Sequence, residues 1–226
     1  MVIELNQLDK RFKKSHALQS VSLKIELDGK LYGLVGPNGS GKTTLISILS
    51  RFLSSDSGSI SGIQKDTLGS FVGNESFMDH LTVQEWLEFL QVLKNLKTDE
   101  STVSELLALL KLDEEADKKI KSLSYGQKQR LGIISAIMGK PKLVIFDEPL
   151  NGLDPSGVFL FKKALTWLID QKISVLYSSH RLDDLANYCN HLFLLNKGKL
   201  LFDGDFETFL KLGNGNIEES YHSLVL

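Results

Sequence analysis

The sequence predicts an α/β protein with a parallel sheet in its core, a small antiparallel β lobe and an inserted α-helical lobe. Apolar runs at residues 31–35, 143–146 and 173–177 have the length and composition of strands that are buried on both faces, as in parallel sheets. Segments with helical spacing of apolar residues separate these runs, and such alternation favours a parallel sheet. Strict apolar–polar alternation near the N-terminus indicates a half-buried strand of a different kind.

Composition excludes several classes of protein. A chain of 226 residues, 42% of them hydrophobic, can form one sizeable globular domain, and a net charge of −2 gives no sign of a general nucleic-acid binder. The single cysteine, Cys189, excludes an internal disulfide and a cysteine metal cluster. The N-terminus has no signal-peptide pattern, and no apolar run approaches the roughly 20 residues of a membrane span. We therefore expect a cytoplasmic chain whose membrane role, if any, depends on a separate partner.

The N-terminal residues predict the antiparallel lobe. Residues 2–8 form one expected strand and residues 21–27 another, with Asp28-Gly29 as a hairpin turn signal before the first buried strand. Between them lies Phe12, whose ring could stack on a nucleobase because every base presents a π-face. Ordinary packing is the alternative for this residue.

Residues 36–44, GPNGSGKTT, match the phosphate-loop pattern G-x-x-x-x-G-K-[ST] between an expected strand and an expected helix. Glycines in the loop permit backbone conformations that direct N–H groups at an anion, and the helix N-terminus adds partial positive charge. Lys42 is expected to reach the terminal phosphates of a nucleotide, and the Thr43 hydroxyl to ligate Mg²⁺. The candidate cofactor-binding residues of the loop are Gly36, Asn38, Gly39, Ser40, Gly41, Lys42, Thr43 and Thr44. A chance match in a glycine-rich turn is the alternative.

The middle of the chain predicts a helical lobe at about 76–140, inserted between core segments at about 1–75 and 141–226. Thr82 and Glu85 form a capping-box pattern ahead of apolar residues at helical spacing. The whole chain is therefore expected to be a single domain with a helical insertion.

A second capping-box pattern, Ser124 with Gln127, begins the last helix of this lobe. A plain helix cap is one interpretation. The other is an anion site, because a helix N-terminus with a hydroxyl and a nearby glycine, Gly126, favours negative charge. Since one chain holds one nucleotide, such a site would complete the nucleotide of another copy and predicts a dimer.

Asp147 and Glu148 follow four apolar residues at the expected C-terminal end of a buried strand, where ligands bind in open α/β sheets. Asp147 is expected to hold Mg²⁺, and Glu148, on the other face of the strand, to act as the general base. Two loop carboxylates without a function are the alternative. His180 follows the next buried strand, and for this residue alone a hydrogen-bonded surface histidine is the alternative.

The remainder predicts a helix whose apolar stripe includes Val158, Leu165 and Ile169, then a buried strand, a hairpin around Lys197-Gly198 and a short final helix.

Together these motifs resemble those of the ATP-binding cassette (ABC) ATPases, the nucleotide-binding subunits of membrane transporters. The phosphate loop, LSYGQ at 123–127, the LVIFDE strand, NGLD at 151–154 and His180 stand in the family's order across essentially the whole chain. The resemblance implies a P-loop NTPase core, ATP and Mg²⁺ as cofactors, and Lys42, Glu148 and His180 as catalytic residues, with His180 at the γ-phosphate.

The resemblance also implies that Phe12 stacks on adenine. Ser124, Gly126 and Gln127 of the signature would lie against ATP on the opposite protomer, with Asp154 at the dimer interface. Two ATP molecules would close a head-to-tail dimer with a second ATPase subunit, identical or paralogous. Hydrolysis would reopen the dimer and drive separate transmembrane permease subunits.

Bacterial exporters of drugs, lipids or antimicrobial peptides are the members that the chain resembles most, which implies a peripheral location on the inner face of the cell membrane. Phe77, Met78 and Trp86 are candidates for contact with the permease, with core packing as the alternative for Trp86. The alternative function is a soluble ABC ATPase that acts on ribosomes or nucleic acid; a catalytically inactive regulatory cassette is another.

Two positions depart from the family pattern. The family usually has a glutamine near the end of the strand expected at 68–72; Gly73 falls there by length, and Asn74 or Glu75 could substitute through an oxygen ligand. This departure bears on hydrolysis rate and coupling. Tyr125 stands in the signature where glycine is common.

Overall fold

The computed structural model describes residues 1–225 apart from 14, 65–66, 73–76, 97 and 187. The predicted substitutes for the family glutamine, around Gly73, Asn74 and Glu75, therefore lie outside the described residues.

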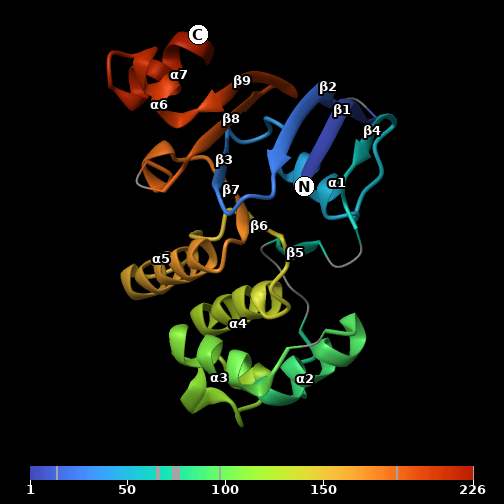
Figure 1. Ribbon diagram of the computed structural model, residues 1–226, viewed down its shortest axis with the longest axis vertical. Coiled ribbons are helices and arrows are strands. Elements are labelled where there is room, and N and C mark those ends of the chain that lie inside the picture. Colours follow the sequence, from blue (N-terminus) through green and yellow to red (C-terminus); the bar gives the residue numbers. More distant parts are fainter. Residues whose placement is uncertain (14, 65–66, 73–76, 97, 187, 226) are drawn as a thin grey trace.

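An antiparallel lobe of three strands forms the upper right of Figure 1. Its strands are β1 (Val2–Phe12), β2 (Ser15–Glu26) and β4 (Ser57–Ser61), in the order β2-β1-β4. The alternation near the N-terminus thus predicted the right kind of strand. The Asp28-Gly29 hairpin is wrong, because β2 pairs with β1 whereas the next strand, β3 (Leu31–Val35), pairs with β7 and β8 of the other sheet. A turn signal marks a change of direction and not the partner of the strand that follows.

The core is a mixed sheet in the order β5-β6-β7-β3-β8-β9, in which only the β8–β9 pairing is antiparallel among the described strands. The expected buried strands at 31–35 and 143–146 are confirmed, as is the hairpin at Lys197-Gly198. The remaining strands are β5 (Leu68–Phe71), β6 (Leu143–Asp147), β7 (Ser174–Ser179), β8 (His191–Asn196) and β9 (Lys199–Asp205).

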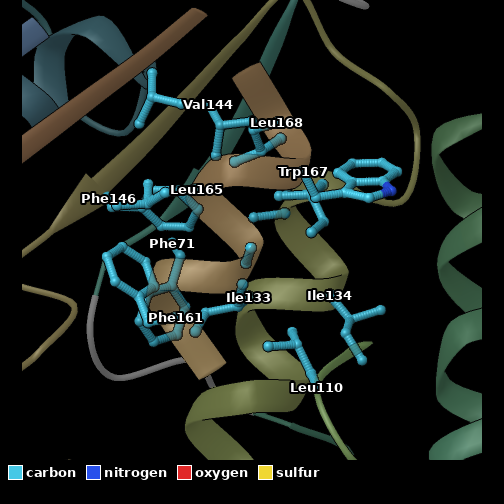
Figure 2. Close-up of a cluster of buried hydrophobic side chains, with 14 of the residues drawn as sticks. Phe71, Leu110, Ile133, Ile134, Val144, Phe146, Phe161, Leu165, Trp167 and Leu168 are labelled. Atoms are coloured by element: carbon cyan, nitrogen blue, oxygen red, sulfur yellow. The ribbon is translucent and has the colours of Figure 1, made fainter. Parts of the chain in front are cut away.

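Alternate residues of the parallel strands enter two separate hydrophobic clusters, one on each face of the sheet. In β6, Val144 and Phe146 belong to one cluster and Leu143 and Ile145 to the other. Figure 2 shows the first cluster, where the Phe146 ring meets that of Phe161 edge-to-face at a centroid distance of 5.1 Å. The sheet is therefore covered on both faces, which explains the uninterrupted apolar runs.

Helices cover both of these faces. The second cluster includes side chains of α1 (Lys42–Leu49) together with the β lobe, while α5 (Pro155–Asp170) packs in the first. Ile169 was expected in the buried stripe of α5, but it is exposed because it stands on the far side of the last helical turn.

A helical lobe lies below the sheet in Figure 1. It contains α2 (Val83–Lys94), α3 (Glu100–Leu109) and α4 (Tyr125–Ile137), with 3₁₀ turns η1 (Asp113–Glu115) and η2 (Ile120–Ser122) between α3 and α4. Both predicted capping boxes are present, since each has the side-chain and the backbone hydrogen bond. The C-terminal end has η3 (Leu182–Asp184), α6 (Phe206–Lys211) and α7 (Ile217–Val225), two helices where one was expected.

Trp86 is a core residue of this lobe. Its indole N–H donates to the Ser135 hydroxyl at 3.0 Å, and its ring packs against Phe77 and Phe89. Of the three residues expected to meet a permease, Met78 is exposed, Phe77 is half-buried and Trp86 is buried. Core packing, the alternative for Trp86, is therefore what the structure has.

Cys189 is also buried, and its thiol donates to the carbonyl of His191 at 3.0 Å. Burial raises the pKa of this thiol to about 12, which keeps it protonated and unreactive. Across the described residues, none of the helices is both long enough and apolar enough for a membrane crossing.

Candidate functional site

A cavity of about 750 Å³ opens where the loops after β3, β6 and β7 meet the β lobe. Because these strands are parallel, their C-terminal ends share one edge of the sheet, as sequence reasoning expected. The lining residues are Phe12, Ser15, His16, Ala17, Gln19, Asn38, Gly39, Ser40, Gly41, Lys42, Thr43, Thr44, Glu148, Asn151, His180 and Lys197.

The phosphate loop follows β3 and ends where α1 begins. Gly41, the N-cap residue of α1, has φ of 111°, and a Cβ on it would lie 2.4 Å from the carbonyl oxygen of Ala17 in β2. At Gly36 a Cβ would lie 2.0 Å from the carbonyl oxygen of Leu195 in β8. Only glycine fits at these two positions, so the loop is clamped between the β lobe and the hairpin of the core.

The interior of the loop presents polar groups to the cavity. The Lys42 ammonium donates to the carbonyl of Gly36 at 2.7 Å and lies 3.6 Å from Oε1 of Glu148. The buried hydroxyl of Ser40 has no hydrogen-bond partner among the described residues. A positive charge, a hydroxyl free to donate and a helix N-terminus fit a phosphate group.

Glu148 lies at the centre of the site. It follows the last residue of β6 with a left-handed φ of 50°, so the expected alternation of the strand does not extend to it. This turn brings Oε2 of Glu148 to 2.6 Å from Nδ1 of His180, and the Asn151 side-chain amide donates to the same oxygen at 3.2 Å. One carboxylate therefore links Lys42 of the phosphate loop with His180 of the neighbouring strand end.

Asp147 is 7% exposed and does not line the cavity; it lies directly behind Glu148. Its Oδ1 accepts from the Ser178 hydroxyl at 2.5 Å, and the Ser178 oxygen accepts from the Glu148 N–H at 2.9 Å. Ser178 of β7 thus fixes both acidic residues through the pairing of β6 with β7.

Candidate oxygen ligands for Mg²⁺ are the hydroxyl of Thr43, a residue that lines the cavity, and the carboxylate of Asp147, whose Oδ1 accepts from Ser178. Hard oxygen ligands in small number suit this ion, since Mg²⁺ keeps several of its waters. The residues present therefore fit the ion.

Phe12 stands at the end of β1 with 44% of its surface exposed and lines the cavity, so it is not a core side chain. The Lys10 ammonium lies 5.7 Å from the centre of its ring. An exposed ring at the rim of the cavity is suited to stack on a base.

The signature residues lie elsewhere. Ser124, Gly126 and Asp154 line a second cavity of about 720 Å³, which shares no residue with the first. Ser124 caps α4 by accepting from the Gln127 N–H at 3.2 Å, and the Gln127 side chain accepts from the Ser124 N–H at 2.8 Å. The plain helix cap is thus present, and one chain does not bring these residues to its own phosphate loop.

Sequence reasoning missed several residues of the first cavity. His16 and Gln19 come from the β lobe and Lys197 from the β8–β9 turn, and no local pattern marks them. Asn151 had a signal because it stands in the NGLD turn, and so had Ser178, which supports the acidic residues without lining the cavity, because it stands in the Ser178-Ser179-His180 run.

Comparison with known proteins gives a consistent result. A family model described as "ABC transporter" matches residues 18–151. YdbJ of Bacillus subtilis, an uncharacterized ABC transporter ATP-binding protein, is 36% identical over 88% of this chain and 68% of its own length. The lantibiotic transport ATP-binding protein SrtF of Streptococcus pyogenes is 29% identical over 100% of this chain and 98% of its own.

The fold also has a solved counterpart. The structure of an ATP-binding subunit of an ABC transporter superposes with a TM-score of 0.87 over 99% of both chains, at 24% sequence identity. At that identity the likeness concerns the fold, including the antiparallel lobe and the mixed sheet.

Proposed function

Because this chain belongs to the ABC transporter family and is one of its ATP-binding ATPases, we propose that it hydrolyses ATP at Glu148 to drive an exporter. The observation that carries the hydrolytic role is the position of Glu148, in contact with both Lys42 and His180 at the edge of the nucleotide-sized cavity.

Each part of the cavity takes one part of the nucleotide. Phe12 stacks on the adenine ring, and the backbone of residues 36–44 surrounds the phosphates. Lys42 exchanges its carbonyl partner for the terminal phosphates, a stronger, charge-assisted contact. Thr43 and Asp147 hold Mg²⁺, which when bound neutralises charge that develops on the phosphate oxygens.

Glu148 positions and deprotonates the attacking water. The contacts that support this role are those with His180 and Asn151, which hold the carboxylate at the cavity. His180 approaches the γ-phosphate from the end of β7 and orients Glu148 at the same time.

A second subunit completes the site. The separation of the two cavities within one chain supports a head-to-tail dimer, in which Ser124, Gly126 and Gln127 of one subunit close over ATP held by the other, and Asp154 lies at the interface. The second subunit is an identical chain or a paralogue. Residues 1–226 act as one domain, with the helical lobe at about 76–140 as the moving insertion.

The cycle of closure and reopening is transmitted to separate transmembrane permease subunits, and the chain is peripheral on the inner face of the membrane. The lantibiotic transport role of the similar protein SrtF supports a peptide antibiotic or a similar drug or lipid as cargo. Met78, which is exposed beside the half-buried Phe77, is the proposed point of contact with the permease.

Glu148→Gln tests the hydrolytic role. The variant keeps the size of the side chain but loses its basicity, so it should bind ATP, accumulate as a dimer and lose at least about 10²-fold in turnover. Light scattering measures the dimer and phosphate release the turnover. Glu218→Gln on α7 is the matched control and should behave as wild type. Retained turnover in Glu148→Gln would assign the base to another residue.

A further inference from the structure

We propose that Tyr125 is a positioning residue that links the signature of each subunit to that subunit's own Glu148. The proposal rests on the proposed function, in which the signature serves the partner's nucleotide while Glu148 serves the chain's own. Tyr125 therefore lies between two sites that act on different ATP molecules.

The first contact is made by the aromatic ring. Tyr125 is the first residue of α4 and is 56% exposed, so the core does not require it. A Cβ on Gly152 would lie 2.8 Å from Cε1 of Tyr125 and 3.5 Å from its hydroxyl oxygen. The ring thus occupies the space beside Gly152 that a side chain would fill, and Gly152 has a φ of 77°, in the left-handed region that favours glycine.

The second contact fixes the ring on its own helix. The side-chain amide of Gln129 donates to the Tyr125 hydroxyl at 2.6 Å, and Gln129 is buried. A buried amide one helical turn away holds the phenol in one orientation, so the ring moves with α4 and not independently.

The turn that contains Gly152 leads back to the catalytic carboxylate. Asn151 donates to Glu148 twice, from its backbone N–H to the carbonyl at 3.1 Å and from its side chain to Oε2 at 3.2 Å. A displacement of α4 therefore passes from Tyr125 to Gly152, then to Asn151 and the Glu148 carboxylate. Asp154, which ends this turn, also caps α5 by accepting from the Gly157 N–H at 2.7 Å, so the far end of the turn is anchored.

The functional consequence is coupling between the two sites of the dimer. When the signature of a subunit docks on the partner's ATP, its α4 takes a fixed position, and Tyr125 transmits that position to Glu148 of the same subunit. Hydrolysis at one site then depends on whether ATP occupies the other.

A mixed-subunit assay separates this role from direct contact with nucleotide. A small amount of chain with intact Glu148 is combined with a large excess of Glu148→Gln chain, so nearly all turnover comes from mixed dimers. Tyr125→Ala is then placed either on the scarce chain, which carries the active Glu148, or on the excess chain, whose signature completes that active site.

We expect turnover to fall by about tenfold when Tyr125→Ala is on the scarce chain, since misplacing a catalytic group has effects of this size or larger. On the excess chain the change should stay below about twofold. Ser124→Ala is the comparison variant: unlike Tyr125→Ala, it should lower turnover when it is on the excess chain, because its hydroxyl acts on the partner's nucleotide. Tyr125→Phe, which keeps the ring beside Gly152, should retain most of the turnover.

Three results would overturn the proposal. They are a larger loss of turnover with Tyr125→Ala on the excess chain than on the scarce chain, an equal loss on both chains, and no loss on either. Absence of turnover in the mixture without any Tyr125 substitution would instead contradict the proposed ATPase site itself. Affinity of the scarce chain for a fluorescent ATP analogue should not change with Tyr125→Ala, which distinguishes positioning from a folding defect.

Discussion

In the proposed ATP site, Lys42 is the residue on which nucleotide binding should depend most directly. Its ammonium donates to the Gly36 carbonyl of the phosphate loop and lies 3.6 Å from Oε1 of Glu148. Lys42 is also the only lysine or arginine in residues 36–44, so its replacement removes the positive side-chain charge of the loop. We predict that Lys42→Ala abolishes ATP binding in isothermal titration. Lys211→Ala on α6 is the control, because this exposed lysine lies outside the cavity and should bind as wild type.

Unchanged ATP affinity in Lys42→Ala would mean that the nucleotide binds elsewhere. It would also contradict the roles proposed for Thr43, Asp147 and Glu148.

At the scale of single elements, helices α2 and α4 can be compared directly because their N-termini have the same kind of cap. Each begins with a capping box, formed by Thr82 with Glu85 and by Ser124 with Gln127. We predict that Thr82→Ala and Ser124→Ala each lower the free energy of unfolding by about 1 kcal/mol, the usual effect of losing an N-cap. Only Ser124→Ala should also lower ATP turnover, since only that cap faces a nucleotide in the proposed dimer. Urea unfolding and phosphate release measure the two effects.

If Thr82→Ala and Ser124→Ala had equal ATP turnover at equal stability, Ser124 would act only as a helix cap.

Helix α5 provides a second test at this scale through two phenylalanines two positions apart. Phe161 is 1% exposed and packs against Phe146 and Tyr177, whereas Phe159 is 57% exposed. Phe161→Ala should cost about 3–5 kcal/mol of unfolding free energy because it opens a cavity in the core. Phe159→Ala should stay within about 0.5 kcal/mol of wild type. Chemical denaturation followed by circular dichroism gives both values.

For the whole molecule, the separation of the two cavities has a kinetic consequence. If each active site needs the signature of a second chain, turnover per chain should fall when the protein is diluted below the dissociation constant of its ATP-bound dimer. Phosphate release measured over a dilution series tests this. A specific activity that is independent of concentration would indicate either a permanent dimer or a site complete in one chain, and light scattering distinguishes the two.

Local sequence patterns predicted those parts of the molecule that local forces determine. The phosphate loop needs glycines at fixed spacing, the buried strand before Asp147 needs a continuous apolar run, and Ser124 needs Gln127 three residues later. Each of these requirements is met by residues within one short segment, so the motif can be recognised from the sequence before the fold is known.

Features that depend on distant segments were not predictable. The left-handed turn at Glu148 replaces strand alternation because Ser178, on a neighbouring strand, holds its N–H. His16 and Lys197 reach the cavity only because the β lobe and the β8–β9 turn pack on the phosphate loop, where Gly198 donates to the Ser40 carbonyl at 2.8 Å.

One tryptophan of the chain is placed where its fluorescence would respond to movement of the helical lobe relative to the core. Of its two tryptophans, Trp86 is enclosed within the helical lobe, but Trp167 of α5 donates its indole N–H to Glu105 of α3 at 2.8 Å. That bond crosses from the core to the lobe. If the lobe moves on ATP binding, as the proposed cycle requires, this bond should lengthen or break. The emission spectrum of Trp167, recorded in a Trp86→Phe background, should then shift when ATP is added, without any added dye.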